Sequence, residues 1–272
     1  MTKIFTGFLA VLSALILVSS PAFSSESVTM TGSTTVLPIA QATLEAYMKA
    51  NPGVHFSLSG TGSGDGIKAL IDKTTDIANA SRAMKAGEME KARHAGIYPI
   101  EFTVGIDAIV PIVHPSNPVS DLSIDQLSQI YQGRITNWKD VGGEDRPIVV
   151  VSRDSSSGTY ECWSDLVLKK QRVSPKAQLQ ASSGAVVETA STNRNALAYV
   201  GMGYLNSSVK AVHVNGIAPS METAKSGEYP ISRPLFMYTD SVPTGETARY
   251  LRFVLSPEGQ KIVEETGYVP LR

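Results

Sequence analysis

The sequence predicts an α/β protein built around a mostly parallel sheet with helices on both of its faces. Short apolar segments alternate with amphipathic segments of helical period along most of the chain. Glycine, serine and threonine cluster where several of the apolar segments end and the amphipathic ones begin. Repeated strand–helix units of this kind favour parallel strands covered by helices.

The first part of the chain alternates strands and helices. Apolar residues at helical spacing run from Val36 to Tyr47, and Asn51-Pro52-Gly53 ends that helix. Val54, Phe56 and Leu58 alternate with polar residues, as in a half-buried strand. In order, we expect a strand at 28–30, a helix at 36–47, a strand at 54–58, a helix at 67–71, a strand at 76–80, a helix at 88–94 and a long strand at 107–113.

The second part continues this alternation. A helical period runs from Leu122 to Tyr131, and PIVVVS (147–152) is the kind of apolar run found in buried parallel strands. After these we expect a helix at 158–170, a helix end running into a strand at 195–205, a strand at 235–238 and two closing helices within 247–267. The single cysteine, Cys162, lies in an apolar rhythm with Trp163 and Leu166, which predicts a buried structural thiol.

The N-terminal residues have the layout of a secretory signal peptide. A short basic start precedes an apolar run from Phe8 to Val18, which is too short to span a bilayer comfortably. Small residues near Ser24 suit cleavage after that position, and no cysteine stands there to carry a lipid anchor. We therefore expect a signal peptide over residues 1–24 and an exported mature chain that does not insert into the membrane.

Composition narrows the class of function. The chain has 24 basic and 25 acidic side chains, so it lacks the basic excess typical of proteins that bind nucleic acid or membrane surfaces. Its four histidines are scattered, with neither paired cysteines nor an HExxH motif to hold a metal. No Gly-x-Ser-x-Gly nucleophile motif occurs. We expect no cofactor and no metal, and these features favour a binding protein over an enzyme.

Three predicted strand-to-helix junctions share one chemistry. They are Gly32-Ser33-Thr34-Thr35, GTGSGDGI (60–67) and SRDSSSGTY (152–160), and NASR (79–82) ends a further strand with a hydroxyl and a cation. The first backbone N–H groups of a helix lack partners and carry partial positive charge, which suits an anion. One such cluster is usually an N-cap. Three of them, with an arginine able to form a forked contact, predict an oxyanion site.

These motifs resemble those of a known family. The stretches TGSTTVLPIA, GTGSGDGIKAL, DIANASR, IDQLSQIYQGRITNWKDVGG, RDSSSGTYE and YPISRPLFMYT occur in this order between about Val28 and Arg272. The chain is similar to the periplasmic phosphate-binding proteins that serve ABC importers. The resemblance implies a two-lobed type II periplasmic binding protein fold with the ligand in the cleft between the lobes. One lobe would hold residues 26–105 and 234–272, and the other residues 106–233.

The resemblance also implies a function and a set of ligand-binding residues. It implies capture of inorganic phosphate in the periplasm by a monomer, delivery to a membrane ABC permease, and no catalysis. Carried over position by position, the ligand-binding residues would be Ser33, Thr34, Thr35, Ser63, Ser81, Arg153, Ser157, Gly158 and Thr159.

One position departs from the family pattern. Well-known members place an aspartate directly after the position of Ser81, where it accepts the proton that hydrogen phosphate carries, whereas this chain has Arg82. Asp65, Asp154 or a backbone carbonyl would then take that role. The departure leaves other tetrahedral oxyanions, namely sulfate, molybdate and tungstate, as alternative ligands. An exported phosphate sensor or adhesion protein and a phosphatase are the alternatives of other classes.

Overall fold

The computed structural model describes residues 27–271, so the predicted signal peptide lies outside the described residues. Elements up to β6 are β1 Ser27–Gly32, α1 Leu37–Ala50, β2 His55–Gly60, α2 Ser63–Ile71, β3 Ile77–Ala80, α3 Ala86–His94, β4 Pro99–Val113, β5 Asp121–Leu122, α4 Ile124–Tyr131, the 3-10 turn Trp138–Val141 and β6 Val149–Arg153. The remainder are α5 Gly158–Leu166, β7 Gln178–Gln180, α6 Ser183–Thr192, β8 Ala196–Gly201, the 3-10 turn Met202–Tyr204, β9 Lys210–Ala211, β10 His213–Val214, α7 Met221–Ser226, β11 Ser232–Asp240, α8 Gly245–Val254 and α9 Pro257–Glu265.

The strands form one curled path with parallel ends and an antiparallel middle. Its order is β2-β1-β3-β11-β4-β8-β6-β7, with β9 beside β4, and β10 pairs with β5 in a small separate sheet. Strands β2, β1 and β3 pair in parallel, as do β8, β6 and β7. Strands β4 and β11 run antiparallel to each other and to their outer neighbours. The predicted α/β class with a mostly parallel sheet is confirmed.

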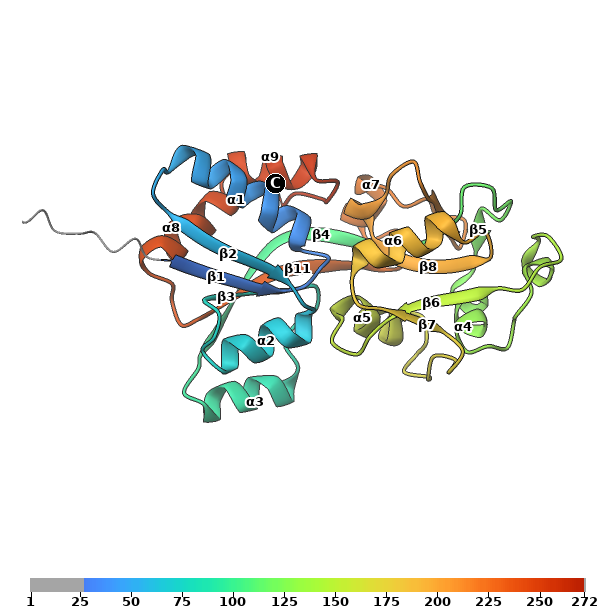
Figure 1. The fold of residues 1–272 in the computed structure, drawn as a ribbon, viewed down its shortest axis with the longest axis horizontal. Coiled ribbons are helices and arrows are strands. Elements are labelled where there is room, and N and C mark those ends of the chain that lie inside the picture. The colour runs from blue at the N-terminus through green and yellow to red at the C-terminus, as the bar shows by residue number, and fades with distance from the viewer. Residues whose placement is uncertain (1–26, 272) are drawn as a thin grey trace, which may run out of the picture.

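The elements gather on either side of the long strands β4 and β11 (Figure 1). We call the group containing β1–β3, α1–α3, α8 and α9 the first lobe, and the group containing β6–β8 and α4–α7 the second lobe. Strand β4 pairs with β11 over Pro99–Ala108 and with β8 over Ile109–Val113. The chain therefore passes between the lobes along paired strands. The exact residue bounds expected for the two lobes remain a prediction.

Alternating side chains on the central strands of the first lobe fill two cores. Ile77 of β3 and Met237 of β11 belong to the large core beneath α1, α8 and α9, whereas Ala78 and Tyr238 face the smaller core beneath α2. The carboxyl ends of β1 and β3 are thereby fixed beside the first residues of α1 and α2.

Stacked aromatic rings hold the core of the second lobe. Trp163 of α5 lies 4.3 Å from Tyr199 of β8, with their planes 7° apart, and 5.0 Å from Tyr131 of α4. The Tyr131 hydroxyl donates to the backbone carbonyl of Val151 at 3.0 Å. All three rings are buried. They pack α4 and α5 against β6 and so fix the junction between β6 and α5.

Several predictions of local structure are wrong. Helix α5 ends at Leu166 instead of residue 170, because Lys169 and Lys170 adopt left-handed backbone angles, with φ of 50° and 64°. No helix end precedes β8 from residue 195, since α6 ends at Thr192. Cys162 is half-buried and Leu166 is 43% exposed, so the prediction of a buried thiol from the apolar rhythm is wrong. None of the helices between residues 27 and 271 is long and apolar enough to cross a membrane.

Candidate functional site

The junctions of the first lobe meet those of the second lobe in a buried polar cluster. Figure 1 shows the starts of α2 and α5 facing each other across the middle of the molecule. The Gly64 N–H donates to the Ser156 carbonyl at 2.8 Å, which joins these two junctions directly. All nine predicted ligand-binding residues are buried, Gly158 among them. The other eight are each at most 3% exposed: Ser33, Thr34, Thr35, Ser63, Ser81, Arg153, Ser157 and Thr159.

One part of the cluster joins α2, β3 and α5. The hydroxyls of Ser63 and Ser81 lie 3.2 Å apart, and the Ser81 N–H donates to Ser63 Oγ at 3.0 Å. Gly158 lies so close to them that a Cβ there would be 2.4 Å from Ser63 Oγ and 2.8 Å from Ser81 Oγ. A larger residue than Gly158 would therefore displace these serine side chains or push the two lobes apart.

A second part joins the start of α1 to the starts of α5 and α6. The hydroxyls of Thr35 and Thr159 lie 2.7 Å apart, and those of Thr34 and Ser183 lie 3.1 Å apart. The Ser183 N–H also donates to Thr34 Oγ1 at 3.3 Å. Four helices of nine or more residues therefore direct their N-termini toward one region: α1, α2, α5 and α6.

Two arginines bring full positive charge to the cluster. Arg153 Nη1 donates to Thr34 Oγ1 at 3.1 Å, and its Nε and Nη2 donate to the carbonyls of Gln180 and Ala181 at 2.9 and 3.0 Å. Burial lowers the pKa of Arg153 below its ordinary value, but an arginine keeps its charge in proteins. The second guanidinium is that of Arg233, which donates from Nη2 to Thr159 Oγ1 at 2.9 Å.

Two of the predicted hydroxyls accept hydrogen bonds from nearby backbone N–H groups. Ser33 Oγ accepts from the backbone N–H groups of Thr35 and Val36 at 3.1 and 3.4 Å, within the turn that precedes α1. Ser157 is the N-cap of α5, and its Oγ accepts from the Tyr160 N–H at 3.2 Å. Both residues lie at the cluster, and each hydroxyl stabilises the local backbone.

Three residues of the cluster were not predicted from the sequence. Ser183 stands in Ser182-Ser183-Gly184, which repeats the Ser156-Ser157-Gly158 pattern at the start of another helix, so a search for that repeat would have found it. Arg233 and the fully buried Asp107 lie on the long strands, where a charge within an apolar run indicates a buried partner but not that this partner lies at the junctions.

Arg82, which stands where the family pattern has an aspartate, is held by two carboxylates. Its Nη1 and Nη2 each donate to the Glu88 carboxylate at 2.7 Å. Its Nε lies 2.6 Å from Glu161 Oε2, which makes an ion pair but not an aligned hydrogen bond. Burial would lower the pKa of Arg82, but these two carboxylates outweigh that effect and raise it. Glu161 belongs to α5, so this ion pair links the two lobes.

We expect Glu161→Gln to weaken binding of an anion in the cluster about fivefold. The substitution removes the interlobe ion pairs of Glu161 with Arg82 and Lys85, together worth about 1 kcal/mol in the closed arrangement, and Arg82 keeps its Glu88 partner. Calorimetric titration measures the change. Asp72→Asn is the control, because its ion pair with Lys68 lies within the first lobe. Equal affinities for all three proteins would show that this ion pair does not support closure.

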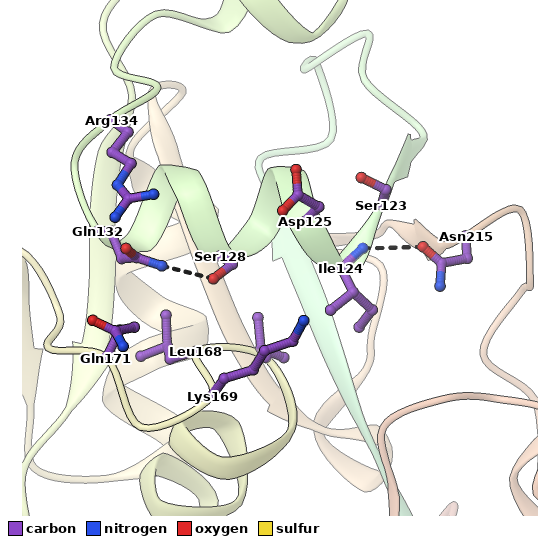
Figure 2. A pocket seen from close by; sticks show the side chains of 11 residues that line it. Ser123, Ile124, Asp125, Ser128, Gln132, Arg134, Leu168, Lys169, Gln171 and Asn215 are labelled. Carbon is purple, nitrogen blue, oxygen red and sulfur yellow. Dashed lines mark hydrogen bonds between the residues drawn. The ribbon is translucent and has the colours of Figure 1, made fainter.

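A cavity of the second lobe lies away from the cluster. It has a volume of about 590 Å³ between α4 and the segment after α5 (Figure 2). Ser123, Asp125, Arg134 and Lys169 line it, and no predicted ligand-binding residue does. Among the described residues there is no group of three or more His, Cys, Asp or Glu side chains suited to a metal ion.

A family model for the PBP superfamily domain matches residues 18–258. The chain belongs to the PBP superfamily. Two curated PBP relatives are "Phosphate-binding protein PstS" of Borreliella burgdorferi, 32% identical over 90% of each chain, and "Protein SphX" of Synechococcus elongatus, 30% identical over 96% of this chain and 82% of the relative. Such relatives agree with the prediction of a binding protein that is not an enzyme.

Solved structures agree with the PBP assignment. A Clostridium perfringens protein described as a phosphate ABC transporter substrate-binding protein, solved with bound phosphate, is 35% identical, with a TM-score of 0.85 over 91% of this chain and all of that one. An ABC-type phosphate transport receptor from Vibrio cholerae is 31% identical, with a TM-score of 0.72 over 89% of this chain and 99% of that one. These neighbours confirm the predicted two-lobed PBP fold.

Proposed function

We propose that the protein binds inorganic phosphate in the buried cluster between its lobes and delivers it to a membrane ABC permease. The observation that carries this proposal is the convergence of four helix N-termini, a set of hydroxyls and two guanidiniums in one dehydrated region. The names of the relatives and of the solved neighbours support phosphate as the anion. We further propose that the mature protein acts as a periplasmic monomer.

The chemistry of the cluster suits a small tetrahedral dianion. Each helix N-terminus contributes about 0.3–1 kcal/mol, and each hydrogen bond to a charged group about 1.5–3 kcal/mol net. Several such donors supply the roughly 8 kcal/mol of a micromolar complex after the losses from ordering. The ligand-binding residues predicted from the sequence remain our assignment for this site. Lobe closure completes their donor set, and the closed form is the one that docks on the permease.

Calorimetry on ligand-stripped protein tests this function. Phosphate is expected to release or absorb heat at micromolar concentration and to raise the melting temperature, whereas sulfate and molybdate compete weakly. No heat and no thermal shift at millimolar phosphate would refute the proposal. Tighter binding of sulfate, molybdate or tungstate than of phosphate would show that the protein's ligand is another oxyanion. Turnover of a chromogenic phosphate ester would favour a phosphatase instead.

We propose that the Asp154 carboxylate accepts a hydrogen bond from the proton of bound hydrogen phosphate. Its Oδ1 accepts from the backbone N–H and hydroxyl of Ser156 at 2.8 and 2.6 Å, and its Oδ2 lies 3.6 Å from Arg153 Nη2. Asp65, the other carboxylate near the junctions, is exposed. A carboxylate beside the anion disfavours sulfate, which has no proton to donate.

Asp154→Asn is therefore expected to reduce the preference for phosphate over sulfate about tenfold, because the amide no longer repels sulfate. Asp65→Asn is the matched control and leaves the preference unchanged. Parallel titrations of each variant with phosphate and with sulfate measure this preference. An unchanged preference in Asp154→Asn would leave a backbone carbonyl as the acceptor.

A further inference from the structure

Arg233 lies at the centre of the polar cluster although it belongs to a long strand that joins the lobes. Its side chain is 4% exposed, and Nη2 donates to Thr159 Oγ1 at 2.9 Å and lies 3.4 Å from Thr35 Oγ1. Thr35 lies in the turn before α1 of the first lobe, and Thr159 lies in the first turn of α5 of the second lobe. The Arg233 guanidinium therefore contacts a residue of each lobe.

Asp107 holds this guanidinium in place from the neighbouring strand. Arg233 and Asp107 are directly paired residues of β11 and β4, and Arg233 Nε and Nη2 donate to Asp107 Oδ2 at 3.0 and 2.8 Å. Asp107 Oδ1 accepts from the Met202 N–H at 2.9 Å. Burial would lower the pKa of Arg233, but the Asp107 carboxylate outweighs that effect and keeps it above its ordinary value. The charge and the orientation of Arg233 are thus fixed by two adjacent strands.

One nitrogen of Arg233 remains available. Nη1 is buried and makes no hydrogen bond of ordinary geometry within residues 27–271. The Cys162 thiol lies beside this guanidinium and, after Asp107, helps to raise the pKa of Arg233 by its charge and by weak hydrogen bonding, and its Sγ donates to the Ser81 carbonyl oxygen at 3.6 Å. A thiol is a weak partner for a guanidinium. A buried donor left without a partner costs free energy that a bound acceptor would recover.

We propose that Arg233 donates from Nη1 to the bound oxyanion and that Asp107 is its positioning residue. This inference rests on the proposed phosphate-binding function and adds a residue to the site. Arg233 is set by a pair of neighbouring strands, so its charge is in place before the lobes close. Arg153, in contrast, reaches Thr34 across the interlobe contact. The site thus combines the guanidinium of Arg233, which is fixed between the lobes, with that of Arg153, which completes the set of donors around the anion when the lobes close.

Arg233→Gln tests the proposal by calorimetry with phosphate. The variant is expected to bind about 10- to 150-fold more weakly, the loss that accompanies one hydrogen bond to a charged group. Arg252→Gln, on the exposed face of α8, changes the net charge equally and is expected to bind like the unmodified protein. Unmodified protein that fails to bind phosphate refutes the proposed function itself. Unmodified affinity in Arg233→Gln refutes the role of Arg233 alone.

The double variant Arg233→Gln/Asp107→Asn separates binding from folding. It leaves no buried charge unpaired, so its phosphate-free melting temperature is expected to lie closer to that of the unmodified protein than that of Arg233→Gln. If Arg233 only neutralises Asp107, the double variant binds phosphate normally; our proposal predicts the same 10- to 150-fold loss. Side-chain NMR of the arginines in the unmodified protein gives a readout that needs no variant of Arg233. Phosphate is expected to shift two buried guanidinium signals, and a shift of the Arg153 signal alone contradicts the proposal.

Discussion

Gly158→Ala is expected to weaken phosphate binding about 10- to 100-fold while leaving the fold intact. The added Cβ would lie 2.4 Å from Ser63 Oγ and 2.8 Å from Ser81 Oγ, which no real Cβ tolerates. Gly158 belongs to the second lobe, and both serines belong to the first, so the overlap is relieved when the lobes separate. Overpacking of this kind costs about 1–3 kcal/mol, and here it falls on the closed state.

Gly184→Ala is the matched control for this experiment. Gly184 also follows a serine in the first turn of a helix of the second lobe, but a Cβ there would meet only Ser182 Oγ, at 3.9 Å. We expect its phosphate affinity to stay within about twofold of the unmodified protein. Small-angle scattering should show that phosphate compacts the control and not Gly158→Ala. Equal compaction and affinity in both variants would contradict the arrangement of the lobes described above.

Sequence analysis identified the polar junctions because their signals are local. Ser63 and Gly158 each stand where an apolar strand ends and a helix begins, and parallel strands bring such ends to one edge of a sheet. That the junctions of the two lobes face each other came from the family resemblance. The residue pattern by itself does not say which junctions meet.

The rest of the cluster depends on contacts that are distant in sequence. Strand β7, before Ser183, is short and polar, so it gave no apolar signal that a helix start would follow. Arg233 and Asp107 are paired across β11 and β4, 126 residues apart, and the register of two such strands is not encoded near either residue. A charged side chain inside an apolar strand was the available sign, since its burial requires a partner.

Arg153→Lys is expected to weaken phosphate binding about 100-fold even though the positive charge is kept. Arg153 is 2% exposed, and three of its nitrogens have fixed partners: Nη1 with Thr34, Nε with the Gln180 carbonyl and Nη2 with the Ala181 carbonyl. Lysine is a point charge on a flexible stem and cannot hold the segment before α6 and reach across the lobes at once. Losing the forked contact removes about 1.5–3 kcal/mol from the bound state.

The same substitution should also affect the protein without phosphate, and the two effects can be separated. Two side-chain hydrogen bonds to backbone carbonyls are lost within the second lobe, so the phosphate-free melting temperature is expected to fall by about 2–8 °C. Arg172→Lys, at an exposed position of the same lobe, controls for the change of side chain. If Arg153→Lys lowers the phosphate-free melting temperature and retains full phosphate affinity, Arg153 supports the fold of the second lobe and does not bind the anion. A loss of affinity far larger than the loss of stability shows instead that the guanidinium is needed for the anion, since stability alone changes the population of folded protein and not its affinity.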